Sequence, residues 1–329
     1  MRKRPRLLLS CTCEDRADFH ARVEMLLGSA RRLGGSLASS PLVVNVVGGA
    51  DPAFAARVQA LGAEVRVVAR APAGAPPHAN KLCMLSLHDR DDFDVLLAVD
   101  CDVAIARDPA PLIGAGAIGV VPADTDPLGE SQWHALLAAL KIEPGPRRVH
   151  ATTTGRPMYP YFNSGVVTVP RALCAELLAR WTDALHELTE LWPREPRLIP
   201  RSKRFFTDQY ALMAALRRGG LPWAVASREL NFPTHVPLHG PTVAGLKPAL
   251  LHYHSEFDQH GLLFRPRCAV AETAADLVNC SHSQAAGIPY RGLRSRPLHS
   301  HAHLAAARLG ERGRSAKRRL RGTIGARGA

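Results

Sequence analysis

The sequence predicts an α/β protein built on one mostly parallel β-sheet with helices on its faces. Short apolar, β-branched runs alternate with segments of helical periodicity through the first half of the chain, which is the pattern of strand–helix–strand units. Apolar residues make up 46% of the 329 residues, enough for a large core. No apolar run approaches the ~18 residues that a membrane-spanning helix needs. We therefore expect a folded α/β domain.

The expected elements follow one another in order from the N-terminus. The strands, rich in Val, Ile and Leu, are residues 6–14, 41–49, 64–70, 94–104, 117–124 and 161–170. The helices, with apolar residues three and four positions apart, are residues 17–35, 51–62, 80–90, 130–142, 171–192 and 205–220. Asp51 and Pro52 form a typical helix start. Because right-handed crossovers bring the ends of successive parallel strands to one side, we expect a ligand site at that edge.

Charge divides the chain into three parts. The net charge is +13, yet residues 281–329 hold eleven Lys and Arg with one acid, and residues 1–6 hold four more basic residues. Residues 7–280 are therefore nearly neutral and form the expected domain, between a basic extension at 1–6 and a basic tail at 281–329. Tyr290 is the only aromatic residue of the tail, which argues against nucleic-acid binding through base stacking. A solvated extension and peripheral contact with an anionic membrane remain open.

The N-terminus and the cysteines indicate the compartment. The start, MRKRPRLLLSC, has a basic cluster but only three consecutive leucines, too few for a signal peptide, so we expect a cytoplasmic protein. The seven cysteines are scattered and form no C-x-x-C pair. This spacing indicates neither a disulfide framework nor a zinc cage.

The stretch VLLAVDCDVA ends an apolar strand with two acids, Asp100 and Asp102. Side chains of a strand alternate between its faces, so these two carboxylates are expected to share one face. An unpartnered buried carboxylate is costly, so the pair either faces water at the sheet edge or holds a cation. Two carboxylates suit Mg²⁺ or Mn²⁺, which often also bind substrate phosphates.

Four more short motifs carry polar residues beside apolar segments. They are Lys81 in NKLCML, Asn163, Ser164 and Gly165 in YFNSGVVTV, Asp208 and Gln209 in FFTDQYAL, and His252 and His254 in LLHYHSEFD. Each also has an ordinary structural interpretation: a solvent-exposed lysine, a turn before a strand, a helix first turn, and a structural histidine.

Taken together and in order, these motifs resemble the GT-A nucleotide-sugar glycosyltransferases. The similarity is greatest to the glycosyltransferase family 8-like branch, with glycogenin and bacterial galactosyltransferases, and covers about residues 7–265. It implies a Rossmann-like GT-A fold in a single catalytic domain. It also implies a nucleoside-diphosphate sugar as donor, with a UDP-sugar favoured, and an acceptor that is a saccharide, a lipid or a protein.

The resemblance assigns a role to each motif. It implies Mn²⁺ or Mg²⁺ as cofactor, held by Asp100, Asp102 and His252. It implies donor binding by Lys81, Asp100, Ser164, Gly165 and His254. It implies catalytic residues Asp208, Gln209 and Asn163 beside the donor sugar. His252 is preferred to His254 as third metal ligand because an apolar pair precedes it, as in the family.

One departure from the family affects the diphosphate site. The family's histidine is usually followed by a glycine and a Lys-Pro-Trp sequence whose lysine holds the diphosphate, but here Lys247-Pro248 precedes the histidine. Arg265 and Arg267 are candidate replacements. The resemblance favours retention at the anomeric carbon, while an inverting enzyme would need a base such as Asp208.

Two other functions fit parts of the sequence. A sugar-phosphate nucleotidyltransferase shares a related sheet, but its Gly-rich loop is missing from SCTCEDRAD after the first strand. A non-catalytic binder of anionic surfaces or nucleic acid would act through the basic tail.

Overall fold

The computed structural model describes residues 4–71, 74–76, 78–145, 149–218, 220–238 and 243–296. The chain divides into a first unit, Met1–Leu293, and a second, Arg294–Ala329. Of the second unit residues 294–296 are described, and they form neither helix nor strand. Most of the predicted basic tail therefore lies outside the described residues, and every element below belongs to the first unit.

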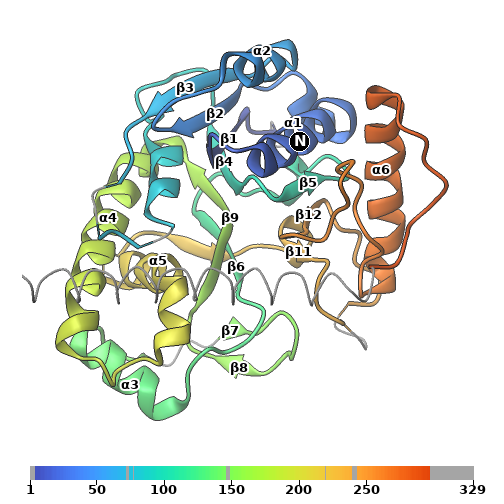
Figure 1. The fold of residues 1–329 in the computed structure, drawn as a ribbon. Coiled ribbons are helices and arrows are strands. Elements are labelled where there is room, and N and C mark those ends of the chain that lie inside the picture. The colour runs from blue at the N-terminus through green and yellow to red at the C-terminus, as the bar shows by residue number, and fades with distance from the viewer. Residues whose placement is uncertain are drawn as a thin grey trace, which may run out of the picture. The chain divides into compact units, whose positions relative to one another are not determined.

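A mixed sheet forms the centre of the first unit (Figure 1). Its seven described strands lie in the order β10 (Trp223–Val225), β6 (Ile118–Pro122), β9 (Phe162–Pro170), β4 (Val95–Asp100), β1 (Leu7–Glu14), β2 (Leu42–Val47) and β3 (Glu64–Val68). Only β9 is antiparallel to its neighbours, and the other pairings are parallel. The predicted mostly parallel sheet flanked by helices is confirmed.

Helices cover both faces of this sheet. They are α1 (Ala17–Leu33), α2 (Pro52–Ala60), α3 (Glu130–Ala139), α4 (Arg171–Arg194) and α5 (Thr207–Arg218), while α6 (Glu272–Ala286) packs against α1. Alternation along the strands sorts the core into two layers. Leu8 and Leu96 belong to a cluster with Leu177 of α4, whereas Leu9 and Leu97 belong to one with Leu26 of α1. Strands buried on both faces explain the nearly continuous apolar runs of the sequence.

A second, smaller sheet stands at the carboxyl end of β4. It joins β11 (Phe232–Pro233), β12 (Leu250–His252) and β5 (Val103–Ile105), with β12 antiparallel to β5. A two-stranded ribbon, β7 (Val149–His150) with β8 (Pro157–Met158), completes the described strands. The predicted single strand 94–104 is thus two strands, because β5 leaves the main sheet to pair with β12.

One expected helix has a different form. Residues 80–90 were expected to be α-helical, but Ala79–Leu85 form a 3₁₀ helix, η2. Ala79, Leu82 and Leu85 are all buried, and their spacing of three residues matches the turn of a 3₁₀ helix. Lys81 and Met84, also three residues apart, are buried as well, so two sides of this 3₁₀ helix face the interior. The other described 3₁₀ helices are η1 (Gly35–Ala38), η3 (Ala110–Leu112), η4 (Arg201–Phe206), η5 (Arg228–Leu230) and η6 (Ala269–Ala271).

The end of the folded unit lies later than the sequence predicted. Helix α6 packs against α1 and continues past position 281, where the tail was expected to begin. Ser281 and Ser283 are buried, and the Nε of Arg32 donates to the Ser281 hydroxyl at 2.6 Å. The boundary at 280 is therefore wrong, because the last turns of α6 belong to the packed core. Among the described residues, no helix has both the length and the apolar character needed to span a bilayer.

Candidate active site

A cavity opens at the carboxyl ends of β1 and β4, the edge at which a ligand site was expected. It is lined by Thr12, Cys13, Glu14, Phe19, Arg22, Val47, His78, Asn80, Lys81, Asp100, Cys101 and Asp102. Thr12 of β1 lies directly opposite Asp100 of β4 in the parallel ladder. The cavity thus brings the two acids together with Lys81, as the sequence predicted, and adds an arginine that the sequence analysis did not single out.

The two acids of VLLAVDCDVA lie in this cavity but contact different partners. β4 ends at Asp100, and the chain turns before β5 begins at Val103. The alternation of a continuous strand, on which we based the expectation of one shared face, does not extend across this turn. Asp100 lies 3.0 Å from the ammonium of Lys81. Asp102 instead faces two histidines: His252, the last residue of β12, and His254, two residues further on.

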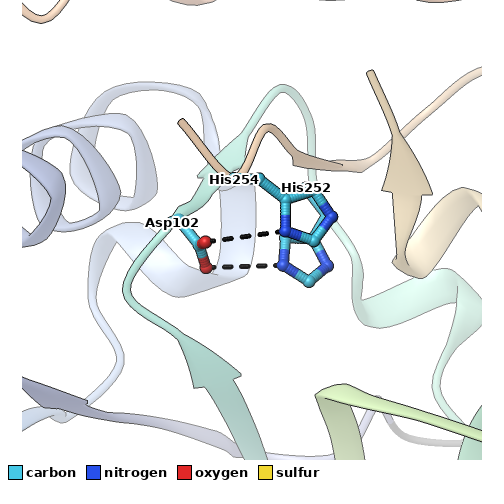
Figure 2. Close-up of side chains that lie close together, drawn as sticks. All are labelled: Asp102, His252 and His254. Atoms are coloured by element: carbon cyan, nitrogen blue, oxygen red, sulfur yellow. Dashed lines mark ion pairs between the residues drawn. The ribbon is translucent and has the colours of Figure 1, made fainter. Parts of the chain in front are cut away.

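Asp102, His252 and His254 form a group that fits a metal ion (Figure 2). Oδ1 of Asp102 is 3.4 Å from Nε2 of His252, and Oδ2 is 3.8 Å from Nδ1 of His254. The two imidazole rings stack, with centroids 4.0 Å apart. Burial would raise the pKa of Asp102, but the neighbouring histidines lower it below its usual value. Both candidate histidines therefore meet the same ionised carboxylate.

The position of His252 is fixed by two contacts. Its Nδ1 lies 2.9 Å from Oδ1 of Asn231, so that nitrogen carries the proton and Nε2 is left facing Asp102. Its ring lies against Gly165, where an added Cβ would be 2.4 Å from Cε1 of His252. Donor binding by Gly165, which the family resemblance implies, stays a prediction, and in the structure the missing side chain of this glycine makes room for the His252 ring.

A second group of potential ligands shares His254. Asp124, His235 and His254 offer ligand atoms within 4.8 Å of one another. Burial raises the pKa of Asp124, and burial lowers the pKa of His235 to about 4. Asp124 ends the predicted strand 117–124, just as Asp100 follows an apolar run. An acid at the end of an apolar strand is thus the sequence signal that could have identified Asp124 as a candidate ligand. His235, between two prolines in FPTHVP, carries no such signal.

Lys81, Ser164 and Asp208 form a buried polar cluster. The Lys81 ammonium lies 3.2 Å from Oδ2 of Asp208 and donates to the Ser164 hydroxyl at 3.0 Å, and that hydroxyl donates to Asp208. Burial would lower the pKa of Lys81, but Asp100 and Asp208 raise it. Burial would raise the pKa of Asp208, but Lys81 lowers it. Lys81 is therefore not an ordinary solvent-exposed lysine.

The remaining candidate residues flank this cluster. Asn163 accepts a hydrogen bond from the Gly165 amide through Oδ1 at 2.8 Å. Gln209 is half-buried and follows Asp208 in the first turn of α5. Oδ1 of Asp208 is buried and has no hydrogen-bond partner among the described residues. This carboxylate oxygen therefore keeps an unused hydrogen-bond acceptor.

Arg22 of α1 lines the same cavity. Its guanidinium lies over the rings of Phe19 and Phe257, 5.4 and 5.6 Å from their centroids, and one terminal nitrogen is 3.9 Å from Asp102. Its Nε is buried without a hydrogen-bond partner among the described residues. Arg265, which the sequence suggested for the diphosphate, pairs with Glu272 at 3.2 Å instead. The contact of Arg22 with an aromatic ring had one signal in the sequence: Phe19 stands three positions before it.

Solved structures of glycosyltransferases are similar to this chain. Among solved structures, a complex of the galactosyltransferase LgtC with donor and acceptor sugar analogues is 17% identical, with 90% of this chain and 99% of that chain covered and a TM-score of 0.49. An active-site mutant of LgtC is 16% identical, with coverages of 83% and 95% and a TM-score of 0.50. Mouse xyloside xylosyltransferase 1 is 14% identical, with coverages of 76% and 97% and a TM-score of 0.44.

The likeness to the LgtC mutant concerns the fold, and it confirms the predicted GT-A architecture. No curated protein sequence matches the chain. The sequence profile of the Rhodobacterales glycosyltransferase domain matches residues 40–220, which is more than half of the chain. That region includes Lys81, both acids of the strand end, and Asp208. The chain therefore belongs to the Rhodobacterales glycosyltransferase domain family and is a glycosyltransferase of the GT-A type.

Proposed function

We propose that this glycosyltransferase moves a sugar from a nucleoside-diphosphate sugar, with a UDP-sugar favoured, to a saccharide, lipid or protein acceptor in a metal-dependent reaction. One observation carries the proposal: a single cavity is lined by the cations Lys81 and Arg22 and by the carboxylates of Asp100 and Asp102, and Asp102 also groups with two histidines. A nucleoside diphosphate needs cations for its phosphates and a metal between them. Membership of a glycosyltransferase family argues against a nucleotidyltransferase and against a non-catalytic binder.

The side chains present fit the implied Mn²⁺ or Mg²⁺. Asp102, His252 and His254 would hold the ion, with Asp100 in the same cavity as a further carboxylate. A carboxylate with imidazoles suits Mn²⁺ better than Mg²⁺, which prefers oxygen ligands. Asn231 fixes the tautomer of His252, an arrangement typical of metal-ligating histidines. The bound ion would neutralise charge that develops on the departing diphosphate.

Lys81 and Arg22 would bind the phosphates. Lys81 is held between Asp100 and Asp208 at the floor of the cavity. Arg22 has a buried, unpartnered Nε and a terminal nitrogen beside Asp102. A guanidinium supported by aromatic rings and lacking a strong ion pair is well suited to bind an oxyanion. In this proposal Arg22 takes the role that the family gives to the lysine of its Lys-Pro-Trp sequence.

Asp208, Gln209 and Asn163 would contact the donor sugar. The free Oδ1 of Asp208 is available to accept from a sugar hydroxyl, while Oδ2 is held by Lys81 and Ser164. Because its pKa is lowered, Asp208 is a weak base. This supports the retaining outcome that the family resemblance favours.

We further propose that the protein works in the cytoplasm, with the basic tail in peripheral contact with an anionic membrane face. The tail's charge supports this placement.

A panel of nucleotide sugars with Mn²⁺, scored for hydrolysis and transfer, tests the proposal. We expect turnover that a chelator stops, that Asp102→Ala abolishes and that Asp100→Ala nearly abolishes. Asp89→Ala, at an exposed acid outside the cavity, should retain full activity. Undiminished turnover in a chelator would refute the metal requirement. A chain with both acids intact that fails to bind UDP or other nucleoside diphosphates in calorimetry would refute the donor assignment.

A further inference from the structure

We propose that Asp124, His235 and His254 form a second cation subsite, beside the Asp102, His252 and His254 group, that binds Zn²⁺ or a similar transition-metal ion. The subsite is separate from the proposed donor metal, although it shares His254 with it. The side chains come from three places in the sequence that the fold brings together.

The three ligands follow the ends of three strands. Asp124 lies two residues after β6, His235 two residues after β11, and His254 two residues after β12. The backbone around them is hydrogen-bonded: the Asp124 carbonyl accepts from the amide of Thr153, and the Thr234 amide donates to the carbonyl of His252. The ligands are therefore positioned by the fold rather than by a loose loop.

The side chains are spaced as ligands of one metal ion would be. Nε2 of His235 is 3.8 Å from Oδ2 of Asp124, which is too long for a hydrogen bond. The His235 and His254 rings lie edge to face, with centroids 4.2 Å apart. One ligand atom from each of the three residues lies within 4.8 Å of the others, close enough for one ion to draw them to ligand distances of ~2.0–2.2 Å.

A ring nitrogen of this group is buried and lacks a partner. Nε2 of His254 makes no hydrogen bond among the described residues, whereas His235 faces Asp124 with its Nε2. Leaving a buried polar atom unsatisfied is costly. Nδ1 of His254 faces Asp102, so we assign Nε2 to the second subsite, where a cation would satisfy it. With both ions bound, His254 would release its ring proton to solvent and bridge them as an imidazolate.

The ligand set indicates the class of metal. Two imidazoles and one carboxylate form a set found in zinc sites, with a further position left for water or substrate. Mg²⁺ and Ca²⁺ prefer oxygen ligands and would bind here weakly. The subsite should therefore distinguish Zn²⁺ and Co²⁺ from Mg²⁺.

Titration of the metal-free full chain with Co²⁺, followed by its visible absorption and by calorimetry, tests the inference. We expect two bound equivalents in the wild type and one in His235→Ala. Asp124→Asn, which preserves side-chain size, should also bind one. Asp102→Asn should lose the ion of the Asp102, His252 and His254 group and keep the ion of the second subsite. His88→Ala, at an exposed histidine outside both groups, should still bind two.

A wild type that binds one equivalent, or two equivalents retained by both His235→Ala and Asp124→Asn, would overturn the inference. Circular dichroism establishes that each variant is folded. The outcome is independent of the proposed function. A chain that transfers sugar with Mn²⁺ but binds one Co²⁺ refutes only the second subsite, and a chain that binds two Co²⁺ without transferring sugar refutes only the proposed reaction.

Discussion

Lys81 shows how a single residue connects the stability of the fold to the chemistry of the site. Its side chain is 9% exposed, and it lies against two carboxylates and the Ser164 hydroxyl. A charge this deeply buried is tolerated only with well-placed partners. In the proposed function the same ammonium also helps to bind the donor diphosphate. Removing it should therefore affect both folding and donor binding.

We expect Lys81→Met to lower the free energy of unfolding by about 3 kcal/mol, because it leaves Asp208 buried without its cation. Adding Asp208→Asn should recover part of this loss, so the two effects will not add. Urea denaturation of the single and double variants measures both quantities. Arg180→Met, which removes an exposed pair with Glu176 on α4, should change stability by less than about 0.5 kcal/mol. Additive losses in the double variant would contradict the proposed coupling.

The same cluster predicts a dependence of stability on pH. The folded-state pKa of Asp208 lies below its usual value, so its contribution to stability is complete above the unfolded value of about 3.9. That contribution is lost as the pH falls below this value. Asp208→Asn should therefore unfold with a shallower loss of stability in acid than the wild type does.

At the scale of elements, a short antiparallel pair, β5 with β12, builds the metal group. His252 pairs with Val103, and the amide of Tyr253 donates to the carbonyl of Asp102 at 3.0 Å. This ladder brings residue 252 next to residue 102. Asn231, between η5 and β11, then orients the imidazole. The orientation of His252 thus depends on a residue outside the group of candidate metal ligands.

We expect Asn231→Ala to raise the Mn²⁺ dissociation constant by about 10- to 100-fold, because His252 loses the contact that fixes its tautomer and orientation. Asn231→Asp retains an oxygen acceptor and should bind Mn²⁺ nearly as the wild type does. Titration followed by electron paramagnetic resonance measures the free ion directly and does not depend on turnover. An unchanged dissociation constant in Asn231→Ala would show that the ladder alone orients His252.

The sequence predicted the elements better than it predicted the contacts between them. Apolar runs located the main strands, because a strand buried on both faces consists almost entirely of apolar residues. It missed the division at Asp100, since a turn of two residues between short strands leaves no periodic signal. It also missed Arg22 and His235, which join the site only through tertiary packing. Motif order brought Lys81, Asp102 and His252 to one region, but Asn231 carries no pattern of its own.

For the whole molecule, the end of the folded unit separates two roles of the C-terminal segment. Residues up to Leu293 belong to the first unit, and α6 contributes buried serines to its contact with α1. After Leu293 the sequence holds ten Lys and Arg and one acid. The packed residues of the C-terminal segment therefore lie before a boundary near residue 293, and nearly all of its basic residues lie after it. Truncation at this boundary distinguishes their effects.

We expect a chain of residues 1–293 to unfold cooperatively at the midpoint of the full chain. A chain of residues 1–280 should melt at a clearly lower temperature, because it loses the bond between Arg32 and Ser281 and the last turns of α6. In sedimentation with phosphatidylglycerol vesicles, the full chain should bind and residues 1–293 should not, since electrostatic attachment requires the basic segment. Neutral phosphatidylcholine vesicles should bind neither chain. If residues 1–293 bound anionic vesicles as tightly as the full chain, the membrane contact would have to come from the catalytic unit, because the charge after Leu293 would then be dispensable.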